Sequence, residues 1–252
     1  IQVRYSKFIY DNIEFLAAAH MYSGHNSVGP AKAQSQSGIP DLQVQFKFGK
    51  PSSIFGGFTL GYRTLRPVIY DVNNIEVNNK ASFYNVGAFF RAQITKDVLF
   101  RTWAIYGDNM TMLGQIGGYG FRAGGDNIYN NKIVGVETLS GWADLDFKLP
   151  NNYKAGIFFG YQQNMGTSKD LALNTNSSNS YIYSFLRDPN LMWFSRLSPR
   201  VEYIVSGKFT LAVEYSHITA KWAKEIDSKL KPLSVYKSNS NNRLELMAKL
   251  NF

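Results

Sequence analysis

The sequence predicts an all-β fold, an antiparallel up-and-down β-barrel that crosses a membrane with its strands. Hydrophobic and polar residues alternate with period two in one segment after another, and the connections between these segments alternate between short and long. No stretch approaches the roughly eighteen consecutive apolar residues of a transmembrane helix. Insertion into a membrane would therefore have to use strands.

Period-two alternation marks eleven strands along the 252 residues. Turn-forming residues make the short connections at 11–12, 50–54, 95–97, 150–152 and 206–207, and the long connections are rich in Asn, Ser, Gly and Lys. Short turns on one rim and long loops on the other are typical of an outer-membrane barrel. The predicted strands are 1–10, 13–21, 41–49, 55–66, 82–94, 98–109, 137–149, 153–165, 192–205, 208–220 and 242–252.

Each predicted strand has one apolar and one polar face. Strand 208–220 places Leu211 and Val213 opposite Glu214, and strand 153–165 places Phe159 opposite Gly160. Strands of about ten residues have the length that a tilted strand needs to cross a bilayer. The alternative is a soluble barrel or sandwich with the apolar faces packed inward, but its strands would usually be shorter.

The chain ends on the alternating stretch "RLELMAKLNF", with Phe252 as the last residue. A terminal aromatic after such a strand resembles the C-terminal signature of bacterial outer-membrane proteins. In that case Leu246 faces lipid and Glu245 faces the lumen. Eleven strands cannot close the even-numbered barrel of bacterial proteins. We therefore expect one domain over 1–252 with eleven or twelve strands, and at least one further strand upstream.

Charged residues on the polar faces are the candidate pore-lining site. Rings of such side chains inside a pore select solutes by charge. The arginines at 63, 91, 196 and 200 are expected away from the strand ends, where a lumen is narrow. The alternative is a solvated wall of paired charges without selectivity. The predicted site comprises Arg63, Arg91, Arg101, Arg196, Arg200, Lys154, Glu202 and Glu214.

The glycine-rich segment at 114–131 suggests either a loop that folds into the lumen or an ordinary extracellular loop. Folding inward would bring Arg122 and Asp126 into the pore. A phosphate-binding glycine motif is disfavoured because no strand-to-helix context surrounds it.

No set of residues predicts catalysis, a metal site or a cofactor. Cysteine is absent, which excludes thiolate metal sites, and histidine occurs only at 20, 25 and 217. His217 invites comparison with outer-membrane phospholipases, whose catalytic His and Ser lie on the outer wall. No serine is spaced to be activated by it, which favours a residue of the interfacial girdle.

The formal net charge of +9 suggests anionic partners. The lysines at 221, 224, 229 and 231 are expected to meet lipopolysaccharide phosphates, with a merely solvated loop as the alternative. The predicted partners are outer-membrane lipid, lipopolysaccharide and small anionic solutes, and no nucleic acid is expected.

The run "RLSPRVEYIVSGKFTLAVEYSHITAKW" at 196–222 resembles the late hairpin of the DcaP-like porins, which pair a "SPRVEY" strand with a "GKxTLxxEY" strand. The resemblance implies a barrel of about sixteen strands. It also implies a homotrimer and passive uptake of small, often negatively charged organic molecules. The chain departs from the family by lacking its N-terminal periplasmic segment and several early strands.

The predicted function is a passive diffusion channel in the bacterial outer membrane for small hydrophilic solutes, with anionic carboxylates preferred. A structural or secretion-associated barrel that docks partner proteins is the alternative, and an occluded lumen would favour it. An outer-membrane enzyme is a third class, which would require His217 for activity.

Overall fold

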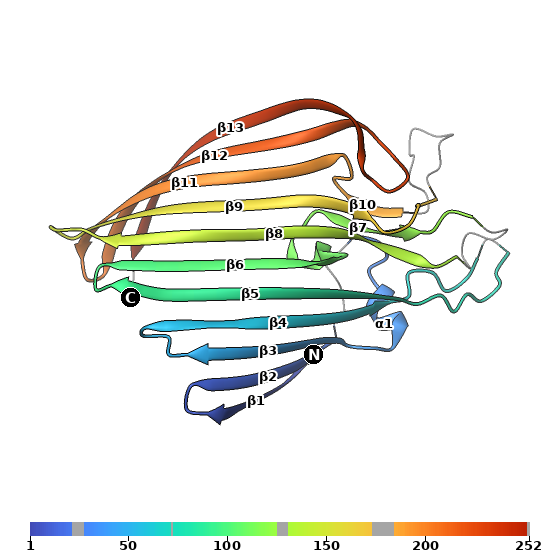
Figure 1. Cartoon of the computed structure of the whole chain (residues 1–252), viewed down its shortest axis with the longest axis horizontal. Helices are drawn as coiled ribbons and strands as arrows, with labels where there is room; N and C mark the ends of the chain where they lie inside the picture. Colours follow the sequence, from blue (N-terminus) through green and yellow to red (C-terminus); the bar gives the residue numbers. More distant parts are fainter. Residues whose placement is uncertain (22–27, 72, 125–130, 173–183, 251–252) are drawn as a thin grey trace.

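The computed structural model describes residues 1–21, 28–71, 73–124, 131–172 and 184–250, and these form one antiparallel β-sheet. Eleven strands follow one another along the sheet in sequence order, which confirms the up-and-down arrangement (Figure 1). They are β1 (Gln2–Tyr10), β2 (Ile13–His20), β3 (Asp41–Gly49), β4 (Ile54–Leu65), β5 (Ala81–Thr95), β6 (Val98–Asp108), β8 (Ile133–Lys148), β9 (Tyr153–Thr167), β11 (Leu191–Ser206), β12 (Phe209–Ile226) and β13 (Pro232–Leu250).

The short connections lie at one end of the sheet and the long ones at the other (Figure 1, left and right). Between β8 and β9, Asn151 and Asn152 have φ of 57° and 65°. Asparagine tolerates this left-handed conformation, which a tight two-residue hairpin requires at both central positions. The turn chemistry therefore fixes the register of this hairpin.

Two strands exceed the length that the alternation predicts by more than the others do. β12 continues to Ile226, and β13 begins at Pro232 where the sequence pattern suggested 242. In the added part of β13 the residues from 237 to 241 are polar on both faces, and this interrupts the period-two signal between Val235 and Leu244. Its turn is held by Asp227, whose carboxylate accepts hydrogen bonds from the amides of Lys229 and Lys231 at 2.9 and 2.8 Å.

Four short elements lie within the long connections: α1 (Ala33–Ser37), the 3₁₀ helix η1 (Met110–Leu113), β7 (Gly117–Phe121) and β10 (Ser184–Arg187). β7 pairs with both β8 and β10. These elements were not predicted, because their sequences are short or glycine-rich and lack alternation. Within the described ranges, no helix is long and apolar enough to cross a bilayer.

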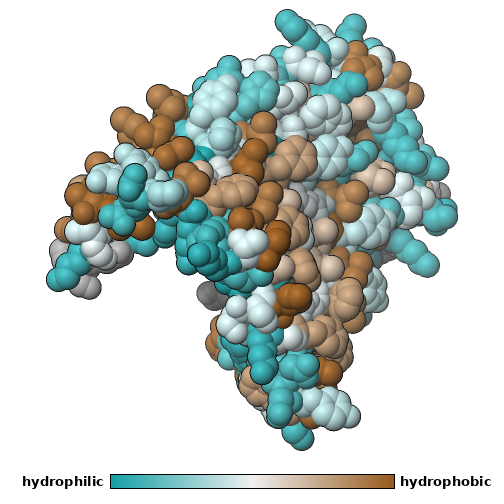
Figure 2. Space-filling model, turned by 60° about the vertical axis from the view of Figure 1, so that its left-hand side comes forward, coloured by the Kyte–Doolittle hydropathy of each residue, from teal (hydrophilic) through white to brown (hydrophobic). Residues whose placement is uncertain are grey.

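The two faces of the sheet differ in chemistry. The register pairs Val213 with Leu246 on one face, which we call the apolar face, and Glu214 with Glu245 on the other, the polar face. Large hydrophobic side chains on the apolar face are exposed to solvent, among them Phe159 at 48%. Figure 2 shows a crescent-shaped molecule, hollowed on one side between two limbs.

The buried hydrophobic core lies at the long-loop end, where β7 packs on the polar face of the sheet. Tyr119 of β7 is fully buried, and its ring lies 5.5 Å from Phe83 of β5 and 5.2 Å from Phe185 of β10, centroid to centroid. A second cluster joins Val136 to Leu171 and Leu230. The loops are thus anchored to the sheet by apolar contacts.

β1 and β13 form the two edges of the sheet. Among the described residues, each pairs with one neighbouring strand only, so the sheet curls without closing. The predicted fold class is confirmed in its antiparallel order and strand content.

We predict that cysteine substitution will separate the two faces in membranes. A thiol at Glu214 is expected to react with a water-soluble maleimide, whereas one at Val213 is expected to be shielded by lipid. A one-residue slip in register would reverse every face. Shielding at 214 together with reactivity at 213 would show that the register is wrong.

Candidate functional site

The polar face brings all eight residues of the predicted pore-lining site onto one side of the sheet. The strand pairings place Arg91 beside Arg101, Lys154 beside Glu202, and Arg200 beside Glu214. The face therefore carries charged side chains on the strands from β4 to β12.

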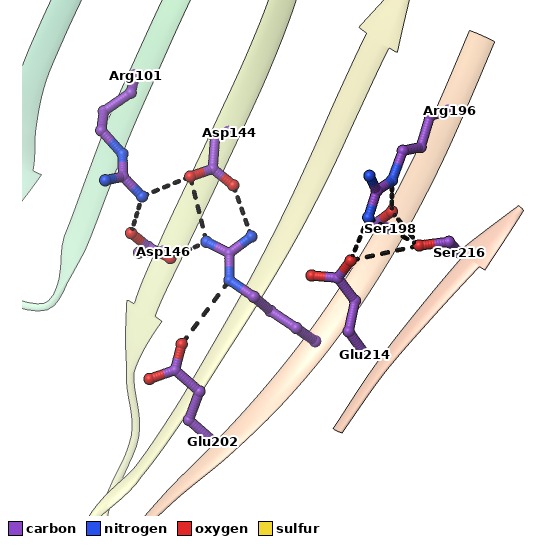
Figure 3. Close-up of polar contacts among 9 residues, drawn as sticks. Arg101, Asp144, Asp146, Arg196, Ser198, Glu202, Glu214 and Ser216 are labelled. Carbon is purple, nitrogen blue, oxygen red and sulfur yellow. Dashed lines mark hydrogen bonds and ion pairs between the residues drawn. The ribbon is translucent and has the colours of Figure 1, made fainter. Parts of the chain in front are cut away.

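Asp144 of β8 is the centre of the largest cluster of charges (Figure 3). Its carboxylate accepts a bidentate pair of hydrogen bonds from Arg200, at 2.8 and 3.1 Å, and also contacts Arg101. Asp146 contacts both arginines as well, and Glu202 lies 3.9 Å from the Nε of Arg200. We call these five residues the Asp144 cluster.

Arg196 of β11 organises a second cluster (Figure 3). Its guanidinium contacts Glu214 and donates to Ser198 at 2.7 Å and to Ser216 at 3.0 Å. It also lies 5.9 Å from the centre of the Phe158 ring, within reach of a cation–π contact. These contacts hold the guanidinium against the sheet from several sides.

These contacts change the charge balance that the sequence suggested. In the two clusters three arginines face four carboxylates, so neither cluster presents excess positive charge. Among the described residues, Arg91 and Lys154 are the members of the predicted site that form no ion pair. The paired and unpaired basic residues are therefore expected to act differently on a passing ion.

For two arginines the predicted distance from the strand ends was wrong. Arg63 lies near the long-loop end of β4, 9% exposed, with its Nε 2.8 Å from Asp41. Arg91 lies near the short-turn end of β5, where it donates to the carbonyl of Pro51. The alternation assigns a face to a residue, but depth depends on where the strand ends.

The segment 110–121 lies against the polar face, which agrees with the inward-folding interpretation for that part of the predicted loop. Gln115 contacts Ser140 and Gln162 on the wall, and Thr138 donates to the carbonyl of Ile116 at 3.2 Å. Arg122 is exposed at its edge, and Asp126 lies outside the described residues. Sequence reasoning missed the contacts of Gln115, because a lone glutamine in a glycine-rich stretch carries no pattern.

Two loop groups have shifted pKa values. Burial raises the pKa of the Tyr119 hydroxyl well above its usual range, so the group stays neutral. A hydrogen bond from Ser228 lowers the pKa of Asp170, which keeps that carboxylate ionised. Both groups therefore keep one charge state near neutral pH.

His217 lies on the apolar face, away from both clusters. Its ring nitrogens contact Asn242 at 2.7 Å and Thr219 at 3.1 Å, and among the described residues no carboxylate contacts the ring to orient it for catalysis. Within the described part of the chain, no group of three metal-ligating side chains is present. The lysines at 221, 224, 229 and 231 lie at the end of the β12–β13 hairpin.

Fold and charged face together define the wall of an outer-membrane type of β-barrel. The crystal structure of the outer membrane channel DcaP of Acinetobacter baumannii has the same fold, with a TM-score of 0.69 and 17% sequence identity. The match covers 100% of this chain and 62% of DcaP, so the chain spans less than two thirds of that channel. The resemblance inferred from the late hairpin is thereby confirmed for the fold.

No protein-family model matches the chain, and no curated protein matches it.

Proposed function

We propose that this chain forms the wall of a porin in the bacterial outer membrane, a passive diffusion channel for small hydrophilic solutes. The observation that carries the proposal is the sheet itself, whose apolar face is exposed across its whole width while its other face is charged. A wall with these two faces fits between lipid and water.

The free-energy cost of placing charged side chains in lipid supports this orientation. Placing one Arg or Lys on the lipid side of a barrel at mid-bilayer costs about 2–4 kcal/mol. The polar face carries many such residues, Arg101, Arg196 and Arg200 among them, so their combined cost would exceed the stability of an ordinary domain. The polar face therefore meets water and lines the lumen.

A membrane-embedded wall also needs its edges paired. An unpaired strand edge in hydrocarbon leaves several backbone groups without hydrogen bonds. Eleven consecutive antiparallel strands leave β1 and β13 pointing the same way, so direct pairing between them would be parallel. We propose that further strands complete the barrel in the membrane.

Anion preference is the second part of the proposal. It is supported by the net charge of +9 and by Arg91 and Lys154, the basic residues of the site that form no ion pair with any carboxylate the structure describes. Lys148 lies beside Lys154 in the register and adds to the same rim. A confined lumen focuses the field of such residues.

Proteoliposome swelling tests the function. Liposomes containing the intact protein are expected to swell in small sugars and faster in monocarboxylates of similar size. Replacing Lys154 with Gln should reduce the advantage of the carboxylate, more at low salt than at high salt, because salt screens exposed charges. Absence of swelling would favour the alternative, a barrel whose lumen is filled by the segment 110–121 and whose loops dock other proteins.

We predict that three copies of the protein associate through part of their apolar faces. Ala17, Ala19 and Ala88 are small residues on that face, and Ala88 lies beside Ala104 in a depression of about 520 Å³. Small side chains allow two barrel walls to approach closely. Native mass spectrometry in detergent is expected to give three copies, and a purely monomeric species would contradict the prediction.

A further inference from the structure

Gly156 of β9 occupies the point where the side chain of Arg200 crosses the strand. It pairs with Arg200 of β11 on one side and with Asp146 of β8 on the other. A β-carbon added at this glycine would lie 2.5 Å from the Cζ of Arg200 and 2.7 Å from its Nε and Nη2. Any other residue would therefore displace the guanidinium from this position.

The missing side chain opens a slot on the polar face of β9. The next residues on the same face are Lys154 and Phe158, both large, and Phe158 stacks on Trp142 with ring centroids 6.1 Å apart. Arg200 lies in the gap between them and reaches Asp144, two strands away. The slot thus joins strands that do not pair with each other.

Lying in the slot keeps the guanidinium against the wall. The side chain of Arg200 is 17% exposed and that of Asp144 is 8% exposed. Without the slot, the guanidinium would have to project toward the lumen, and Asp144 and Asp146 would retain only Arg101. The charges would be separated, with the positive group nearer the pore axis.

We propose that Gly156 is a positioning residue that sets the ion preference and the width of the pore at this level by holding Arg200 flat against Asp144 and Asp146. The inference rests on the proposed channel function and deepens it. Gly156 has no side chain that could contact a solute, so it acts through Arg200.

Single-channel recording of the intact protein tests this inference. Gly156→Val is expected to lower the conductance and to shift the reversal potential toward anions, with Gly156→Ala giving a smaller shift in the same direction. The decisive comparison uses Arg200→Gln as background, in which Gly156→Val should have little further effect, because the clash is gone. Gly160→Ala is the control for Gly156→Ala on the same face of the same strand, since its β-carbon would meet the Phe158 ring, at 3.0 and 3.2 Å, and would have no contact with Arg200 within 4 Å.

A second readout separates this inference from the channel proposal. Carbodiimide modification of Asp144 and Asp146, followed by mass spectrometry, is expected to rise in Gly156→Val and to stay at the wild-type level in Gly160→Ala, whether or not the protein conducts. A silent wild-type channel would contradict the proposed function, while the labelling would still decide the role of Gly156. Unchanged labelling, or an equal effect of Gly156→Val with and without Arg200, would overturn the inference.

Discussion

Replacing Asp144 with Asn is expected to shift the pore strongly toward anions and to destabilise the barrel. Asp144 is 7% exposed and is the shared partner of Arg101 and Arg200. Removing its charge leaves two guanidinium groups with Asp146 as their close partner. Breaking a fully buried pair costs about 3–5 kcal/mol. We expect about 2 kcal/mol here, because the side chain of Arg101 is 39% exposed and solvent screens part of the interaction.

Glu202→Gln is the matched control for this substitution. Glu202 belongs to the same cluster, but its carboxylate lies 3.9 Å from Arg200 and is 33% exposed. Its replacement should cost under about 1 kcal/mol, as for a surface pair. Reversal potentials and urea unfolding in lipid vesicles measure the two effects. Equal effects of the two variants would show that Asp144 is not the centre of the cluster.

Replacing Tyr119 with Ala is expected to detach β7 and β10 from the polar face and to widen the pore. The side chain is fully buried between Phe83 and Phe185. Truncation of a large buried aromatic costs about 3–5 kcal/mol, and here that cost falls on the elements that hold the segment 110–121 against the wall. Conductance should rise and its fluctuations should grow, as recorded in single channels.

Tyr119→Phe provides the contrast. The Tyr119 hydroxyl is buried and has no hydrogen-bond partner among the residues that the structure describes. Removing it should leave stability unchanged or raise it, because an unsatisfied buried polar group is costly. A Tyr119→Ala variant that conducts like wild type, with β7 still protected from proteolysis, would refute an anchoring role for this ring.

The alternation of residues predicted the eleven strands because each has one apolar and one polar face, so that every second residue is of the same kind. Where both faces are polar the signal disappears, as at residues 237–241 of β13. The short elements β7 and β10 could not be predicted for another reason. β7 is rich in glycine and β10 has only four residues, so neither shows a periodicity. Their positions depend on contacts with Phe83 and Val136, which lie far away in the sequence.

Alternation predicted the face of the sheet on which the site residues lie, but it did not predict which of them form ion pairs with one another. Arg196 and Arg200 were assigned to the polar face from alternation, and the register agrees. The partner of Arg200 is 56 residues away and is reached across a third strand. Only the three-dimensional arrangement shows that Gly156 leaves room for this contact, so the sequence alone could not separate the ion-paired arginines from Arg91, which forms no ion pair among the described residues.

The most direct test of the central claim is the current through the intact protein in a planar lipid bilayer. A water-filled lumen behind the polar face predicts discrete conductance steps that grow in proportion to salt concentration, with a reversal potential on the anion side in a salt gradient. The folded protein should give these steps without any added energy source. Folded, membrane-inserted protein that produces no steps at any voltage would contradict the claim that the polar face lines an open channel.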